Sequence, residues 1–131
     1  MANYSLGLDV GEKRIGVALA DDGVKIAVPT QTVLVDGTEI DTIKKIISDE
    51  NIQIVVVGYP RNQSGDVTPQ TTFVEEFIEK LDITTKIVFQ DESLTSVLAE
   101  QRLITEGKPY EKGDIDKLAA AIILQDYLET H

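Results

Sequence analysis

Cysteine is absent from this 131-residue chain, and the single histidine is the last residue, His131. Without cysteine the protein has no disulfide framework, no thiol nucleophile and no thiolate zinc site. Without an internal histidine, a Ser-His-Asp triad and imidazole-based metal sites are effectively excluded as well. Any catalysis must therefore use carboxylates, lysine, serine, threonine, tyrosine or a metal ion held by oxygen atoms.

Long apolar runs are missing too. No segment approaches the ~20 apolar residues that a membrane span requires, and the N-terminus lacks a secretory pattern. These features lead us to expect a cytoplasmic location and no contact with a membrane.

Basic residues are few, because 12 lysines and arginines stand against 23 aspartates and glutamates, which gives a net charge of −11. Such an acidic body disfavours non-specific binding of nucleic acid. A nucleic-acid site on this chain must therefore be a local cluster of positive charge.

In other respects the composition is typical of a globular domain, with 42% hydrophobic and 27% charged residues. A chain of this length buries roughly two-thirds of its unfolded surface and can fold without disulfide bonds or structural metal ions. We predict a single domain over residues 1–131, with no internal repeat and no low-complexity linker.

The hydrophobic pattern predicts three strands followed by alternating helices and strands. The first three strands are expected at 4–10, 15–20 and 24–35, with an Asp-Gly turn at 21–23 and Pro29 marking an edge or a bulge. Two more strands are expected at 52–57 and 85–90. Helices are expected from Thr38, from Thr68, from Ser93 or Thr95, and over about 114–128. This order predicts an α/β fold with a mixed five-stranded sheet, three antiparallel strands and then parallel additions, flanked by helices.

Acidic residues stand at three places near the predicted carboxyl ends of the strands, where α/β folds bind ligands. They are Asp9, the pair Asp91 and Glu92, and the pair Asp114 and Asp116. Each could instead serve a turn or cap a helix, and Asp114 and Asp116 precede the last helix as caps do. Converging carboxylates would suit Mg²⁺ or Mn²⁺. Two such ions can stabilise the attacking and leaving oxygens of phosphodiester hydrolysis, although the spacing does not fix their number.

Six of the twelve basic residues fall in segments predicted near these acids, and we expect them to form a positive rim that contacts phosphates. They are Lys13, Arg14, Arg61, Lys108, Lys112 and Lys117. Ordinary solvated surface charges would look the same. A polar loop expected at 58–66, which contains Arg61 and Asn62, is long enough to reach a substrate but could equally be a surface connection.

Four segments together resemble the YqgF family, whose members are described as pre-16S rRNA nucleases and earlier as RuvX-type Holliday junction resolvases. The segments are 7–11 with 13–16, 56–60, 91–96, and Asp116 with the helix that follows it. The resemblance covers essentially the whole chain in the family's order and spacing. It implies a ribonuclease-H-like fold and a Mg²⁺- or Mn²⁺-dependent endonuclease that acts on nucleic acid, most readily precursor 16S rRNA.

The resemblance also implies roles for single residues. By matching positions, the catalytic, metal-holding carboxylates are Asp9, Glu92 and Asp116. Asp114 could share the metal with Asp116. The family usually has arginine after the Asp-Glu pair, whereas this chain has Ser93. Hydrolysis could therefore be weak, or Arg102 or Lys117 could bind the phosphate instead.

Other functions stay open on the sequence alone. A non-catalytic nucleic-acid or ribosome-associated module would fit Ser93 and the acidic charge. Asp9 and the glycines that follow it also resemble the first phosphate loop of actin-like and sugar-kinase ATPases, which generally need two such domains. A DNA junction offers the same phosphodiester as RNA and would call for a two-fold dimer, so monomer and homodimer both remain possible.

Overall fold

The computed structural model describes residues 3–59, 68–91 and 95–131. Its elements follow the order predicted from the sequence. They are β1 (Tyr4–Val10), β2 (Arg14–Asp21), β3 (Ala27–Leu34), α1 (Glu39–Asp49), β4 (Ile52–Tyr59), α2 (Pro69–Leu81), β5 (Lys86–Asp91), α3 (Thr95–Glu106) and α4 (Lys112–Thr130).

The strands form one five-stranded sheet in the order β3-β2-β1-β4-β5. The β1–β2 and β2–β3 pairs are antiparallel, whereas β4 pairs parallel to β1, and β5 pairs parallel to β4. The predicted mixed sheet is therefore confirmed. Because β1, β4 and β5 run in the same direction, their carboxyl ends meet at one end of the sheet.

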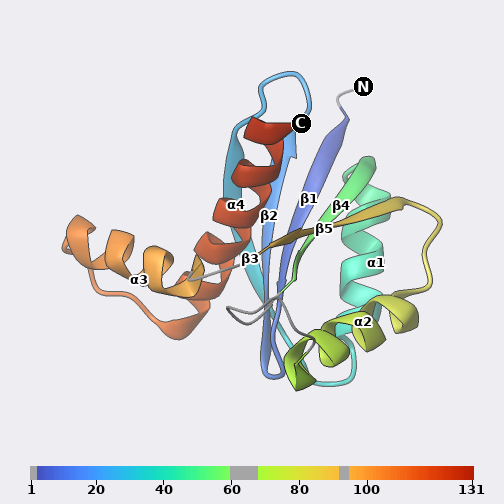
Figure 1. Ribbon diagram of the computed structural model, residues 1–131, viewed down its shortest axis with the longest axis horizontal. Coiled ribbons are helices and arrows are strands. Elements are labelled where there is room, and N and C mark those ends of the chain that lie inside the picture. Colours follow the sequence, from blue (N-terminus) through green and yellow to red (C-terminus); the bar gives the residue numbers. More distant parts are fainter. Residues whose placement is uncertain (1–2, 60–67, 92–94) are drawn as a thin grey trace.

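Helices cover both faces of the sheet, with α1 and α2 on one face and α4 on the other, while α3 projects outward beside α4 (Figure 1). Because successive side chains of a strand point to opposite faces, each strand contributes residues to both layers. Leu6 and Leu8 of β1 are buried with the α1–α2 layer, and Ala18 of β2 and Val56 of β4 pack with α4. No helix in the described ranges is long and apolar enough to cross a membrane.

Capping explains where two of the helices begin. The predicted start of α2 is confirmed, since Pro69 opens the helix and the Thr68 hydroxyl accepts a hydrogen bond from the Thr71 amide. At α1, Thr38 stands at the N-cap but makes no capping bond. Its hydroxyl donates instead to the Asp36 carboxylate at 2.6 Å, so the expected capping bond to a helix amide is not made.

The other differences from the predicted bounds lie at strand and helix ends. β4 continues through Gly58 and Tyr59, because these residues pair with the end of β5, so the predicted loop begins later than position 58. β3 starts at Ala27, and the β2–β3 register shifts next to Pro29, which confirms the bulge on an edge strand. α4 begins at Lys112, two residues before the predicted start.

Candidate metal-binding and nucleic-acid site

Asp9 lies near the end of β1 on the sheet face that α4 covers. Strand side chains alternate between faces, and Gly7, two residues earlier, abuts α4, because a Cβ added there would lie 2.7 Å from the Cβ of Leu124. Leu8 and Val10 are buried on the opposite face. The partly buried Asp9 side chain therefore belongs to the α4 side of the sheet.

The close approach of α4 brings Asp116 level with Asp9. Gly16 pairs with Asp9 across β1 and β2, and a Cβ on Gly16 would lie 1.9 Å from the carbonyl oxygen of Asp116. Ala120, one helical turn later, lies in the same way against Gly7. Two strand residues advance about 6.7 Å and four helical residues rise about 6 Å. The two contacts are therefore spaced equally along the strand and along the helix. The main chains of the two residues predicted as metal ligands thus lie at the same level of the sheet, with Gly16 between them.

Asp116 forms an ion pair with Arg14, whose Nε donates to Oδ2 at 2.6 Å. The Arg14 and Asp116 side chains are 30% and 21% exposed, so the pair is partly shielded from water. The main chain of Arg14 is fixed, because its carbonyl accepts a hydrogen bond from the Gly11 amide and it pairs with Leu34 of β3. The guanidinium therefore extends to α4 from a rigid turn.

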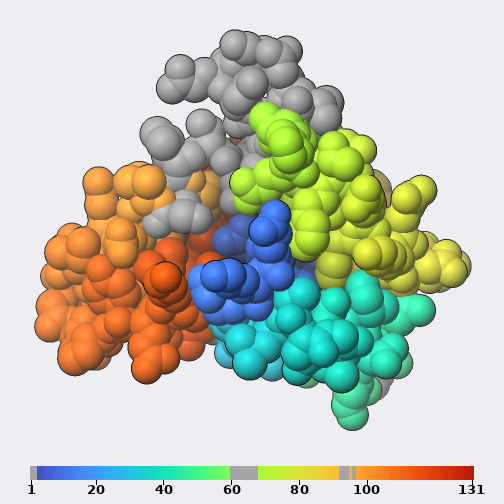
Figure 2. Space-filling view, turned by 90° about the horizontal axis from the view of Figure 1, so that it is seen from below, coloured from blue at the N-terminus to red at the C-terminus, as the bar shows by residue number. Residues whose placement is uncertain are grey.

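The β1–β2 turn, α2 and α4 enclose an open hollow of about 390 Å³, which we call the Asp116 hollow. Figure 2 views this end, with the turn in blue at the centre, α2 in yellow-green on one side, and α3 and α4 in orange and red on the other. The lining residues are Gly11, Glu12, Lys13, Arg14, Gln70 and Asp116. The predicted cations Lys13 and Arg14 are thus brought beside a predicted metal ligand.

Gln70 is a lining residue that sequence reasoning missed. It stands in the first turn of α2, directly after Pro69, and its amide can donate to or accept from a phosphate group or a base. The sequence could have pointed to Gln70, because α2 was predicted to begin beside it, after the strand that ends near Asp9.

Asp114 makes the contacts of a helix start. Its Oδ2 accepts a hydrogen bond from the backbone amide of Glu111 at 2.9 Å, and Lys117 Nζ lies 3.4 Å from its Oδ1. The Glu111 hydrogen bond, followed by Lys117, lowers the pKa of Asp114. Residues two apart on a helix do not share a face, and Asp114 does not line the Asp116 hollow. These contacts favour the capping role, and a share in metal binding stays a prediction.

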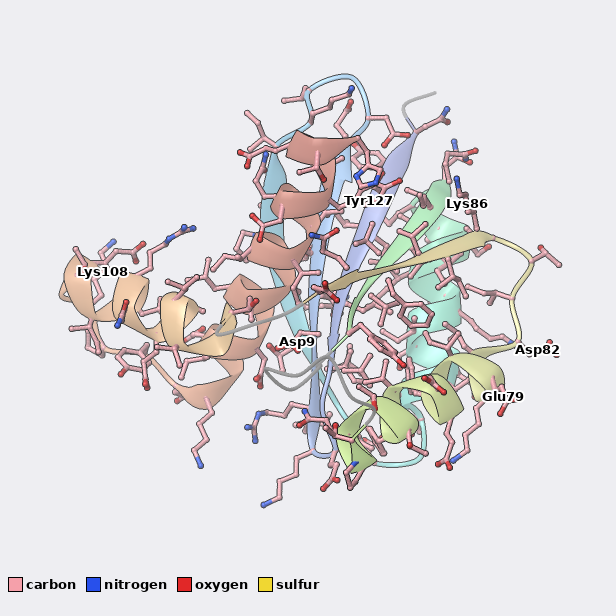
Figure 3. The ribbon with its side chains drawn as sticks, in the orientation of Figure 1. Asp9, Glu79, Asp82, Lys86, Lys108 and Tyr127 are labelled. Carbon is pink, nitrogen blue, oxygen red and sulfur yellow. The ribbon has the colours of Figure 1, made fainter. Side chains whose placement is uncertain are left out.

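The predicted positive rim is divided between two places. Lys108 and Lys117 line a second hollow of about 300 Å³ with Asp114, between α3 and α4. Figure 3 shows Lys108 at the outer end of α3, well away from Asp9. Among the described cations, Lys13 and Arg14 are therefore the ones that line the Asp116 hollow.

The end of β5 supplies Asp91, which pairs with Tyr59. Val88 packs on the α4 side and Ile87 on the α1–α2 side, so alternation places Asp91 on the face opposite to Asp9. The residues predicted as a ligand or as substrate contacts at Glu92, Arg61 and Asn62, and the departure at Ser93, lie outside the described residues. Within residues 3–59, 68–91 and 95–131, no three potential ligands gather as a metal site.

The donor chemistry of Asp9 and Asp116 fits a hard divalent cation, because Mg²⁺ and Mn²⁺ prefer carboxylate oxygens. Asp9 and Asp116 are each partly buried, and a partly buried acid is costly without a compensating charge. Arg14 supplies part of that compensation in the structure.

Solved structures of two resolvases share this fold. A RuvC structure from Thermus thermophilus superimposes with a TM-score of 0.58 at 9% identity, covering 97% of this chain and 95% of that chain. The Fowlpox virus resolvase, solved with substrate Holliday junction DNA, gives a TM-score of 0.55 at 16% identity, covering 99% and 98%. The likeness confirms the ribonuclease-H-like fold.

Curated relatives match the sequence more closely. One from Roseiflexus sp. (strain RS-1) is 41% identical over 131 residues, covering 95% of this chain and 93% of the relative. One from Caldanaerobacter subterraneus subsp. tengcongensis is 43% identical over 133 residues, covering 95% of each. Both carry the name "Putative pre-16S rRNA nuclease". The family model described as "RuvX: Holliday junction resolvase" matches residues 3–130, and the chain therefore belongs to the RuvX (YqgF) family.

Proposed function

We propose that this protein is a metal-dependent endonuclease that hydrolyses phosphodiester bonds, with precursor 16S rRNA as its substrate and the cytoplasm as its location. The observation that carries the proposal is that the main chain of Asp116 packs on Gly16, the residue that pairs with Asp9 near the carboxyl end of β1. The names of the relatives support the RNA substrate.

In this proposal Asp9 and Asp116 hold Mg²⁺ or Mn²⁺, with Glu92 as the third carboxylate. A bound divalent cation would polarise the phosphodiester and lower the pKa of an attacking water. The protein's own contribution is to fix the two acids on rigid elements, since Asp9 lies in a central strand and Asp116 is held by the contact of α4 with Gly16. Hydrolysis requires such fixed geometry at the reacting phosphate.

Lys13, Arg14 and Gln70 are the described residues that would bind the substrate backbone, because they line the Asp116 hollow. Arg61, Asn62 and Lys117 are further proposed contacts. Since the body carries a net charge of −11, few cations act on the nucleic acid. We therefore expect modest affinity that falls steeply with salt concentration.

A second candidate function is resolution of DNA junctions. The description of the family model favours it, and the structural neighbours include a resolvase solved with junction DNA. A junction has two strands to cut symmetrically, so this function would require a two-fold dimer with two sites. Cleavage of RNA would work equally well in a monomer.

The test compares cleavage of three end-labelled substrates: precursor 16S rRNA leader, single-stranded DNA and a four-way DNA junction, each in Mg²⁺ and in Mn²⁺. Wild type is compared with Asp9→Asn and with the control Asp49→Asn, which neutralises an exposed acid of α1 paired with Lys45. We expect metal-dependent RNA cleavage that Asp9→Asn abolishes and Asp49→Asn preserves. Cleavage of the junction alone would select the second function. Folded protein that binds Mn²⁺ but cuts nothing would show a non-catalytic binding module.

A further inference from the structure

Arg14 is hydrogen-bonded to a carboxylate oxygen of Asp116, a residue of the proposed metal site. Its Nε lies 2.6 Å from Oδ2 of Asp116, the carboxylate that would bind the cation. A guanidinium is always charged at physiological pH, and its hydrogen bond uses one of the lone pairs that the carboxylate could offer a metal ion. A divalent cation on Asp116 would therefore be repelled by the Arg14 charge, and at Oδ2 it would also compete with Arg14 for the oxygen.

Backbone contacts hold the main chains close together on both sides of this ion pair. The turn bonded from Gly11 to Arg14 and the pairing of Arg14 with β3 hold one side. The contact of Asp116 with Gly16 holds the other, because the helix backbone lies directly on the strand. Only the side chains can rearrange when a cation arrives, and the long Arg14 side chain has the greater reach.

A second partner for the guanidinium is available within that reach. Arg14 lines the Asp116 hollow together with Lys13 and Gln70, and its side chain is 30% exposed there. The contact with Asp116 is made through Nε, and no further partner of the guanidinium is recorded among the described residues. Arginine binds phosphate oxygens with paired hydrogen bonds, so a nucleic-acid phosphate in the hollow would be a strong alternative partner.

We propose that Arg14 is an exchangeable counter-ion that neutralises Asp116 in the metal-free protein and transfers to a substrate phosphate when a divalent cation binds. The inference rests on the proposed metal site and deepens it. One consequence is that metal and nucleic acid bind cooperatively. The metal frees Arg14 from Asp116 to bind a phosphate, and the phosphate draws the Arg14 charge away from the metal. By linkage, nucleic acid strengthens metal binding by the same factor by which metal strengthens nucleic-acid binding.

The test is a titration with Mn²⁺ alone, with free Mn²⁺ measured by electron paramagnetic resonance, on wild type, Arg14→Ala and Arg14→Lys. Without nucleic acid, Arg14→Ala should bind Mn²⁺ on the order of tenfold more tightly than wild type, because a competing charge has gone. Arg14→Lys keeps the charge and should stay close to wild type. The matched control is Lys45→Ala, which removes an exposed cation of α1 that pairs with Asp49, and it should change the affinity less than twofold.

The titration is then repeated with an uncleavable 2′-O-methyl RNA oligonucleotide. Wild type should bind Mn²⁺ more tightly with the oligonucleotide than without it, and Arg14→Ala should lose most of that gain. Far-ultraviolet circular dichroism confirms that each variant is folded, and Arg14→Gln, which keeps the aliphatic stem, replaces Arg14→Ala if alanine disturbs the turn.

Two results would overturn the exchange. If Arg14→Ala binds Mn²⁺ as wild type does, the ion pair does not compete with the metal, and if it binds more weakly, Arg14 positions Asp116 for the metal instead. Asp116→Asn separates these failures from a failure of the proposed function. Loss of Mn²⁺ binding in Asp116→Asn keeps the metal site and rejects only the exchange. Wild-type binding by Asp116→Asn would reject the metal site and the exchange together.

Discussion

Replacing Gly16 by alanine tests how the fold builds the site. A Cβ on Gly16 would lie 1.9 Å from the carbonyl oxygen and 2.3 Å from the carbonyl carbon of Asp116. Ordinary contact needs about 3.4 Å, so α4 would have to move outward by about 1.5 Å at this level. The obstacle is the main chain of a helix, so no rotamer change can relieve it.

The expected cost follows from the contacts that such a movement weakens. Overpacking a core typically destabilises a protein by about 1–3 kcal/mol, and this site belongs at the upper end because α4 packs on the central strands through Ala120, Ile123 and Leu124. For a domain of this size, a loss of about 3 kcal/mol lowers Tm by roughly 10 °C. Moving Asp116 away from Asp9 by more than 1 Å should also reduce catalysis by about a hundredfold.

Urea unfolding followed by circular dichroism measures the stability, and Mn²⁺ titration measures the site. The matched control is Gly113→Ala in the first turn of α4, where a Cβ would meet the Thr32 side chain at an ordinary 3.6 Å. Alanine replaces helical glycine there, so this variant should be at least as stable as wild type. If Gly16→Ala were as stable as Gly113→Ala and bound Mn²⁺ normally, the close packing of α4 would not be what positions Asp116.

Three further predictions follow from local contacts. Because the Glu111 amide lowers the pKa of Asp114 from its usual 3.8, ionised Asp114 stabilises the fold at neutral pH. Asp114→Ala should therefore lower Tm at pH 7, and its difference from wild type in thermal melts should fade as the pH falls below about 4. Thr68→Ala removes the α2 cap and should cost about 1 kcal/mol in urea unfolding, whereas Thr68→Ser should cost little. Lys13→Ala should weaken RNA binding and reduce the slope of log K against log salt by about 0.7 in filter-binding assays, and an unchanged slope would remove Lys13 from the phosphate contacts.

The elements were predictable because their signals are local. Apolar alternation gives the strands and the helical period gives the helices, and the Thr68-Pro69 pair marks the start of α2 within the sequence itself. Thr38 shows where local reasoning stops. The Thr38 hydroxyl can bond either to a helix amide or to the Asp36 carboxylate. It bonds to Asp36, and the sequence pattern does not say which partner is preferred.

The candidate site was predictable in part. Asp9 was expected at the end of the first strand, and it lies there, in a strand that the topology puts at the centre of the sheet. The choice between Asp114 and Asp116 was left open by spacing, because both precede the same apolar helix. In the structure α4 starts at Lys112, and this start distinguishes the two residues. Asp114 accepts a hydrogen bond from the Glu111 amide as a capping residue, whereas Asp116 pairs with Arg14. A cap at Glu111 is a weak sequence signal, since glutamate is not among the residues that favour this position.

The ion pair of Arg14 and Asp116 had no local signal, since 102 positions separate the two residues. The pair depends on Gly16, which lets the helix backbone reach the strand, and on a turn that aims Arg14 at that helix. A small residue in a strand predicts a close approach but does not name the partner. The same contact places one of the few cations of a protein with a net charge of −11 beside a proposed metal ligand. Under the proposed exchange, Arg14 is released from Asp116 when a divalent cation binds there, so metal and substrate binding are coupled through the packing of α4 on β2.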